Sequence, residues 1–403
     1  MHNLEELTTH CIRCGFCLED CPTFVETSSE LESPRGRIYL VRSAIEGKLN
    51  WQEDVKPHLD LCLGCRACET ACPSGVQYGA ILEIARDKIE SESRTFSKQA
   101  LLAGTTNPGL LKAQLAASKL LPGKKVPNFV SKLLSGTTPE AELPKPQHTT
   151  PLPPLVTDQP VRGEVYMLTG CAMQVLYARV HECTRRLLRR IGYVIKDVDQ
   201  GCCGALHAHN GDLKTARKMA SNLVQSFKDD LPIIVNSAGC GSTMKEYGEL
   251  VDAEGFAKRT FDLTEFLLSH GLLDELKKAP GLNSKRITYH DACHLSHGQK
   301  ITSAPRELIQ AIPYSTFVEL PESMMCCGSA GVYNVLQPQM ARRLLNRKVS
   351  HVQETNAEIV ATGNPGCHAW IAQGCREQNS AQVLHTAELL EAAFIGLENF
   401  SEP

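Results

Sequence analysis

The 403-residue chain lacks the features that mark membrane-spanning, exported or nucleic-acid-binding proteins. It has no stretch of about twenty consecutive apolar residues, so no segment is expected to span a bilayer. Its first residues, MHNLEELTTHC, are polar and show no basic segment followed by an apolar one, so no secretory signal is expected. The formal net charge is −3 with both signs interspersed, which argues against a nucleic-acid partner held by a global positive field.

The chain also lacks the short motifs by which proteins bind organic cofactors or cleave substrates. It contains no G-x-G-x-x-G after a predicted strand, no P-loop, no G-x-S-x-G and no H-E-x-x-H. We therefore expect no catalytic residue and no flavin site in this chain. If the protein carries electrons, the organic chemistry has to take place on another subunit.

Cysteine, in contrast, is abundant, with 18 residues in an otherwise ordinary composition. A chain of this length can bury a sizeable core and does not need disulfides for stability. Without a visible export signal, the cysteines indicate a reducing, cytoplasmic setting in which thiols serve as metal ligands.

The strongest pattern is a C-x2-C-x2-C-x3-C-P run that occurs twice near the N-terminus. In each run, three closely spaced thiolates can hold three corners of a cubane, and the fourth, beside the proline, reaches the other cluster. Paired zinc sites are the alternative, because C-x-x-C is also a zinc signature. Two complete runs favour two [4Fe-4S] clusters, one on Cys11, Cys14, Cys17 and Cys72 and the other on Cys62, Cys65, Cys68 and Cys21.

Eight further cysteines form a C…CCG…C pattern that also occurs twice. Nearly constant offsets between the two copies predict an internal duplication, whose lobes can bring both sets toward one interface. Four soft ligands from three loops suit zinc or an additional iron-sulfur cluster. The candidate ligands are Cys171, Cys202, Cys203 and Cys240 in the first copy and Cys293, Cys326, Cys327 and Cys367 in the second; Cys183 and Cys375 are expected to be packing residues.

Histidines and arginines near these motifs leave alternatives open. The histidines serve either metal ligation and proton handling or simple loop-end hydrogen bonding, and the latter is favoured for any single one. Arg35 and Arg37 either pair with the clusters or with a partner's carboxylates, or begin a solvated helix. A solvated surface is expected for Arg185, Arg186, Arg189 and Arg190. The histidines near the cysteine motifs are His207, His209, His290, His294, His297 and His368.

The apolar periodicity divides the chain into four regions. Residues 1–95 are expected to be helical, with helices over 36–46 and 78–93, and residues 96–162 to form a helical, then proline-rich linker whose lysines 112–132 are weak candidates for membrane contact. Residues 163–285 and 286–403 alternate strands and helices, which predicts two α/β lobes with largely parallel sheets. Expected strands are 165–168, 233–235, 287–289, 316–320 and 358–361, and expected helices are 175–191, 213–227, 305–312 and 338–353.

These motifs resemble the iron-sulfur subunits of glycolate oxidases over nearly the whole chain. The resemblance includes Cys11-Ile-Arg-Cys-Gly-Phe-Cys17, Ser33-Pro-Arg-Gly-Arg37 and Gly201-Cys-Cys-Gly-Ala205. The duplicated pattern is similar to the cysteine-rich CCG domain of heterodisulfide reductase and its relatives, whose repeat closes with C-x-x-C. Here Cys240-Gly-Ser-Thr243 and Cys367-His-Ala-Trp370 lack the last cysteine, so the five-cysteine set is incomplete in both repeats.

The resemblance implies a multidomain protein, an α-helical ferredoxin-like domain followed by a duplicated α/β CCG domain. It implies FAD-containing partner subunits that oxidise glycolate to glyoxylate, and a chain that relays electrons to a membrane quinone at the cytoplasmic face of the inner membrane. An iron-sulfur subunit of a lactate or glycerol-3-phosphate oxidising complex is the alternative of the same class. A non-catalytic zinc- or cluster-stabilised assembly protein is the alternative of another class.

Overall fold

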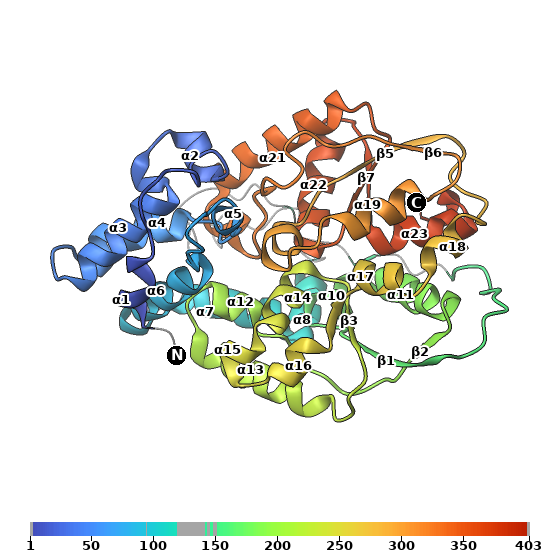
Figure 1. The fold of residues 1–403 in the computed structure, drawn as a ribbon, viewed down its shortest axis with the longest axis horizontal. Coiled ribbons are helices and arrows are strands. Elements are labelled where there is room, and N and C mark those ends of the chain that lie inside the picture. Colours follow the sequence, from blue (N-terminus) through green and yellow to red (C-terminus); the bar gives the residue numbers. More distant parts are fainter. Residues whose placement is uncertain (1–2, 94, 119–141, 143–145, 148–150, 401–403) are drawn as a thin grey trace.

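A computed structural model describes residues 3–93, 95–118, 142, 146–147 and 151–400. A helical N-terminal domain lies at one end of the molecule, and two α/β lobes lie side by side next to it (Figure 1). Most of the predicted proline-rich segment before residue 151, together with Lys119, Lys124, Lys125 and Lys132, lies outside the described residues.

Two helices with buried apolar faces form the core of the N-terminal domain. Ser33 caps the first of them by accepting a hydrogen bond from the Gly36 amide, and Pro34 starts it with a preset φ. Val41 from this helix packs with Ile81 and Ile89 from the second, which spans the range predicted for it. The helices are α1 (Leu4–Thr9), α2 (Pro22–Thr27), η1 (Glu30–Glu32), α3 (Pro34–Ile45), η2 (Trp51–Val55), α4 (Lys56–Leu61), α5 (Ala67–Thr70) and α6 (Tyr78–Ser93).

Helices α7 (Phe96–Thr106) and α8 (Pro108–Ser118) connect this domain to the lobes, as expected for the helical half of the linker. Leu111 and Leu115 of α8 are buried in the core that the two lobes share. Helix α8 is therefore packed against the body of the molecule.

The first lobe contains a parallel sheet with strand order β2-β1-β3-β4. The predicted helix 175–191 was wrong as one element, because the chain leaves helical geometry at Tyr177, where φ is −126° and ψ is 43°. The Tyr177 hydroxyl donates to the Pro365 carbonyl of the other lobe, 2.9 Å away, and this contact accompanies the break. The strands are β1 (Gly163–Met167), β2 (Tyr193–Ile195), β3 (Ile233–Val235) and β4 (Thr260–Asp262); the helices are α10 (Ala172–Leu176), α11 (Ala178–Arg190), α12 (Ala205–His209), α13 (Leu213–Ser226), α14 (Ala238–Lys245), α15 (Tyr247–Val251), α16 (Glu254–Lys258), α17 (Leu263–Ser269) and α18 (Leu272–Leu276).

The second lobe repeats this topology, with a parallel sheet in the order β6-β5-β7-β8. In both lobes the first strand lies between the second and the third, so the duplication predicted from the cysteines extends to the fold. The strands are β5 (Lys285–Tyr289), β6 (Ser315–Phe317), β7 (Ile359–Thr362) and β8 (Gln382–His385); the helices are η3 (His294–Gly298), α19 (Ser303–Gln310), α20 (Tyr333–Leu336), α21 (Pro338–Glu354), α22 (Pro365–Glu377), α23 (Thr386–Ile395) and η4 (Leu397–Phe400).

The two lobes share one apolar core. Ile234 and Leu263 of the first lobe belong to the same buried cluster as Ile287 and Leu390 of the second. The backbones also join directly, because the Ala238 amide donates to the Gly363 carbonyl at 3.1 Å. The lobes are therefore one packing unit.

A buried ion-pair cluster crosses this lobe interface. Glu391 of α23 is fully buried and accepts hydrogen bonds from Arg186 at 2.6 Å and from Arg190 at 2.8 Å, both on α11. The expected solvated arginine face was thus wrong for these two residues, whose side chains are only 10% and 11% exposed. The helical pattern marks them as polar, but it does not reveal that a second copy of the fold covers them.

We expect Glu391→Gln to lower the free energy of unfolding by about 3–5 kcal/mol, because it leaves buried guanidinium groups without their carboxylate. Urea unfolding of the full chain measures this. The control is Asp197→Asn, which removes the partner of the more exposed Arg185 and should cost no more than about 1 kcal/mol. Equal losses in the two variants would contradict a buried cluster.

Candidate functional site

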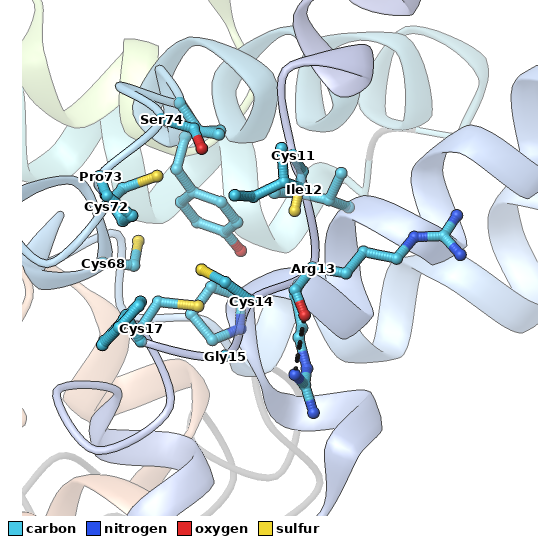
Figure 2. Close-up of a pocket in the computed structure, with 16 residues that line it drawn as sticks. Cys11, Ile12, Arg13, Cys14, Gly15, Cys17, Cys68, Cys72, Pro73 and Ser74 are labelled. Atoms are coloured by element: carbon cyan, nitrogen blue, oxygen red, sulfur yellow. Dashed lines mark hydrogen bonds between the residues drawn. The ribbon is translucent and has the colours of Figure 1, made fainter.

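The first candidate site is a hollow of about 410 Å³, part of it open to solvent, in the N-terminal domain. Its lining contains the whole predicted first set, and Figure 2 shows these sulfurs turned toward a common space. Burial raises the pKa of the Cys17 thiol to about 11, whereas Cys14 is exposed to solvent. The thiols that line it are those of Cys11, Cys14, Cys17 and Cys72, with Cys68 beside them.

A tight loop between α1 and α2 carries the first three of these cysteines. Arg13 and Gly15 both have positive φ, 60° and 90°, which winds the chain around the hollow. The Arg35 guanidinium closes the loop from α3 by donating to the Arg13 carbonyl at 3.1 Å. A side chain on Gly15 would be strained at its φ of 90°, so the turn favours glycine there.

The second candidate site is a hollow of about 250 Å³, part of it open to solvent, whose lining residues all belong to the N-terminal domain. Its thiols are those of the predicted second set, each no more than 9% exposed. The Gly64 amide donates to the Cys62 sulfur at 3.4 Å, and the Tyr78 hydroxyl donates to the same sulfur at 3.6 Å. The four cysteines are Cys21, Cys62, Cys65 and Cys68, and Cys68 lines both hollows.

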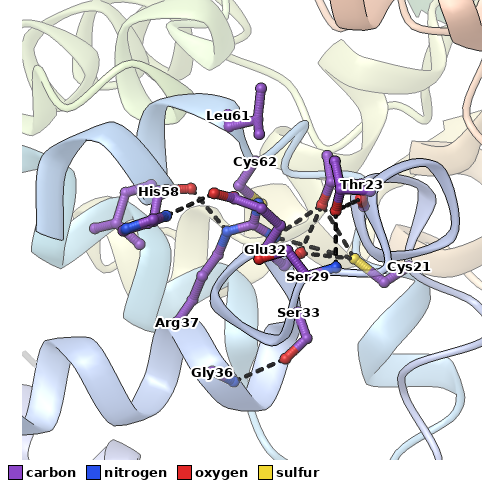
Figure 3. Close-up of polar contacts among 12 residues, drawn as sticks. Cys21, Thr23, Ser29, Glu32, Ser33, Gly36, Arg37, His58, Leu61 and Cys62 are labelled. Carbon is purple, nitrogen blue, oxygen red and sulfur yellow. Dashed lines mark hydrogen bonds and ion pairs between the residues drawn. The ribbon is translucent and has the colours of Figure 1, made fainter.

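Arg37 places a buried positive charge beside this second hollow. Its side chain is 1% exposed and donates to the Glu32 carboxylate at 2.8 Å and to the Thr23 hydroxyl at 3.0 Å (Figure 3). Burial disfavours the Cys62 thiolate, but the charges of Arg37 and Arg86 outweigh this and lower the pKa of that thiol. Arg37 was expected either to place its charge beside the cysteines or to begin a solvated helix. The structure shows its charge beside the cysteines.

The N-terminal domain contacts both lobes through ionic and polar bonds. Arg86 of α6 donates to the Cys62 carbonyl of its own domain and to the His209 carbonyl of the first lobe, at 2.7 Å each. Arg66, next to Cys65, forms an ion pair with Glu246, which lies between α14 and α15. On the other side, the Tyr333 hydroxyl of the second lobe donates to the Leu61 carbonyl at 2.8 Å. The N-terminal domain is therefore held against both lobes close to the second hollow.

The duplicated cysteines converge within each lobe. In the first lobe, Cys171 follows β1 and its sulfur lies 3.5 Å from that of Cys202. In the second lobe, Cys293 follows β5 and contacts Cys326, and the chain of contacts continues to the next two thiols. The remaining members are Cys203 and Cys240 in the first set and Cys327 and Cys367 in the second, on equivalent loops and helices.

The glycine that ends each CCG run lies close to the backbone of the helix that follows it. Gly204 and Gly328 both have positive φ, 83° and 89°. A Cβ on Gly204 would lie 2.9 Å from the Ala216 carbonyl oxygen of α13, and one on Gly328 would lie 2.6 Å from that of Ala341 of α21. In both lobes this close approach brings the paired cysteines against the following helix.

Most of the candidate histidines have ordinary hydrogen-bond partners. His207 contacts Asp212 at 3.0 Å, His209 contacts Glu83 at 2.7 Å, and His297 contacts Thr70 at 2.9 Å. His290 differs, because it is fully buried and neither ring nitrogen has a hydrogen-bond partner within normal limits among the described residues.

Sequence reasoning missed the groups that surround the cysteines. Tyr78, Arg66 and Arg86 contact the second site or hold it in place, and none of them belongs to a metal-binding pattern. Of these three residues, Arg66 could have been noticed from the sequence, because it lies inside the second cysteine run, between Cys65 and Ala67. Its positive φ is visible only in the structure.

Two four-cysteine hollows in a helical domain, followed by duplicated cysteine-bearing lobes, define an iron-sulfur protein of the dicluster class. The model of the 4Fe-4S dicluster domain matches residues 8–76, and that of the cysteine-rich CCG domain matches residues 165–245 and 287–372. The chain belongs to the family of glycolate oxidase iron-sulfur subunits, because two of them are 33% and 31% identical to it over 95% of its length.

The relatives support this membership over most of their length. The chain is 33% identical to the probable glycolate oxidase iron-sulfur subunit of Bacillus subtilis strain 168, covering 95% of this chain and 94% of that protein. It is 31% identical to the glycolate oxidase iron-sulfur subunit of Escherichia coli K12, covering 95% and 93%. It is also 29% identical to lactate utilization protein A of Oceanobacillus iheyensis, but over 56% of this chain and 96% of that protein.

A solved structure of a hypothetical protein from Helicobacter pylori shares the fold, with a TM-score of 0.51 and 8% identity over 98% of this chain and 77% of that one. Among the described residues, no helix combines the length and apolarity that a membrane crossing requires.

Proposed function

We propose that this chain is the electron-transfer subunit of a glycolate-oxidising complex, holding one [4Fe-4S] cluster in each hollow of the N-terminal domain. The observation that carries the proposal is the pair of hollows, each lined by one complete predicted set of four cysteines. Four thiolates per hollow fit the ligand requirement of a cubane. When bound, the clusters supply one-electron transfer.

The chain's own residues fix the path and its electrostatics. Cys68, a proposed ligand of the second cluster, also lines the first hollow, so the two sites adjoin. Arg37 and the Gly64 amide favour negative charge on the buried site, and this stabilises its reduced form. Exposed Cys14 places the first site where a partner can reach it, so we place electron exchange with a partner there.

Glycolate is favoured over lactate as the substrate of the complex. Both relatives named for glycolate oxidase align over 95% of the chain, whereas the lactate utilization protein aligns over 56%. FAD-containing subunits would oxidise glycolate to glyoxylate, and the electrons would pass through this chain to quinone at the cytoplasmic face of the membrane. A complex that oxidised only lactate would overturn the substrate.

Metal analysis and EPR of the reduced full-length protein test the relay. We expect about eight irons per chain in the two hollows and signals of two interacting [4Fe-4S] clusters. Silence in the [4Fe-4S] region, with zinc in the N-terminal cysteines, would instead support the assembly-protein alternative and overturn the relay.

An exposed apolar patch beside Cys14 is the proposed docking surface for the flavin-containing partner. Its members are Ile12, Phe16 and Tyr39, which are 67%, 69% and 54% exposed. Large exposed apolar side chains that surround a redox site are typical of an interface core. The patch adjoins the first hollow, which Ile12 and Phe16 help to line.

We expect Phe16→Ser to weaken binding of the partner about tenfold, because loss of an interface aromatic typically costs more than about 1 kcal/mol. Titration of the partner against quinone reduction measures this. The control is Phe96→Ser, which removes a phenylalanine that is 83% exposed on α7 and lines neither hollow. Equal weakening in both variants, or none in either, would contradict this docking surface.

A further inference from the structure

The second lobe holds three metal-ligating groups close together. One ring nitrogen of His290 and the sulfurs of Cys327 and Cys367 all lie within 4.8 Å of one another, and all three residues are buried. His290 follows β5, Cys327 belongs to the second CCG run, and Cys367 lies in the first turn of α22. Donor atoms at this separation can bind one ion between them.

His290 is the second, independent observation at this place. Its side chain is 0% exposed, and neither nitrogen makes a hydrogen bond of normal geometry among the described residues, although one faces the backbone of Ser323. A buried, unsatisfied imidazole costs free energy, so a binding partner for it is expected. With one ring nitrogen toward the backbone of Ser323, the other can face a metal.

The surrounding groups are also suited to a metal-thiolate site. The Asn364 amide donates to the Cys367 sulfur at 3.5 Å, which orients a ligand from outside the site. Lys348, 2% exposed, faces the thiols of Cys326 and Cys327 and supplies positive charge where thiolates would form.

The first lobe lacks both of these polar groups. Three residues before the first cysteine of each set lies Leu168 in the first lobe and His290 in the second. The CCG glycines lie close to Ala216 of α13 and Ala341 of α21, so these two helices are equivalent. Seven residues after each alanine lies Leu223 in the first lobe and Lys348 in the second. Both leucines are buried. The two lobes therefore share four cysteines but differ in the groups that complete a site.

We propose that the second lobe, and not the first, binds a single soft divalent ion of the Zn²⁺ class through His290, Cys327 and Cys367. The imidazole adds a third ligand in a repeat that lacks the closing cysteine. Binding releases the two thiol protons to solvent, and the two thiolates balance the charge of the ion. Because such an ion has no redox chemistry, the site stands apart from the electron relay.

Zinc and iron analysis of the full-length protein tests this proposal. Wild-type protein should contain about one zinc per chain, with a nitrogen ligand at about 2.0–2.1 Å in zinc X-ray absorption. His290→Leu, which copies the first lobe, should lose the zinc and keep its iron. The control His207→Leu, which removes a buried histidine just beyond the first CCG run, should keep both.

Two further measurements keep the proposal falsifiable if His290→Leu does not fold. Co²⁺ added to zinc-depleted wild type should produce thiolate charge-transfer absorption, and His290→Cys should retain zinc but replace its nitrogen ligand by sulfur. An all-sulfur zinc shell in the wild type, zinc retained in His290→Leu, or extra iron and sulfide in place of zinc would each overturn the proposal. Failure of the relay would appear separately, in EPR and quinone reduction.

Discussion

Cys14→Ser is expected to abolish electron transfer to quinone while the complex continues to oxidise its substrate. Cys14 belongs to the proposed first ligand set and lies at the exposed edge of its hollow. Loss of this ligand interrupts the path between partner and acceptor, but a dye that accepts electrons directly from the flavin should still be reduced. Parallel assays with quinone and dye measure the two activities.

The appropriate control is Cys375→Ala, which removes a buried thiol of α22 that lies outside both hollows. It should leave quinone reduction unchanged, and Cys14→Ser should leave the lobes folded by circular dichroism. If quinone and dye reduction fell together in an intact Cys14→Ser complex, a simple relay through the first site would be wrong.

Arg37→Met should have two large effects, one on stability and one on the second site. It leaves the Glu32 carboxylate without its buried cation, so we expect the free energy of unfolding to fall by about 3–5 kcal/mol. It also removes positive charge near Cys21 and Cys62, so the reduction potential of the second cluster should decrease. Urea unfolding and EPR-monitored redox titration measure the two effects.

Arg35→Met is the matched control, because it removes an arginine two residues away on the same helix. Its ion pair with Glu30 is 30% and 50% exposed, so its loss should cost no more than about 1 kcal/mol. The potential of the second cluster should not change. If both variants lowered that potential equally, net charge and not the buried position of Arg37 would set it.

The parts of the structure that follow from local pattern were predictable from the sequence. Helix α6 and strand β3 have the predicted bounds, because α6 shows apolar periodicity on its buried face and β3 is an unbroken run of β-branched apolar residues that are all buried. The duplicated topology also followed from the repeated cysteines, since equivalent loops require equivalent strands. Strands β2, β4 and β8 escaped prediction because runs of three or four residues carry little periodicity.

Features that depend on long-range packing were not predictable. Arg186 and Arg190 each stand beside another arginine in the sequence, which suggests a solvated face. They are buried because they pair with Glu391 of α23. Tyr177 sits in a helical pattern, and its departure from the helix coincides with a bond to the other lobe. His290 appeared equivalent to the other loop histidines until its surroundings showed that both of its ring nitrogens are buried without a hydrogen bond of normal geometry among the described residues.

The common core of the two lobes has a consequence for how a duplicated protein diverges. Each copy supplies apolar residues that the other needs, such as Ile234 and Ile287, so neither copy can be discarded even if its cysteines hold nothing. One copy is then free to change its chemistry while it continues to serve as scaffold. Leu168 and Leu223 of the first lobe occupy the positions equivalent to His290 and Lys348 of the second. This pattern is expected if one copy kept polar groups for a site and the other kept only its packing role.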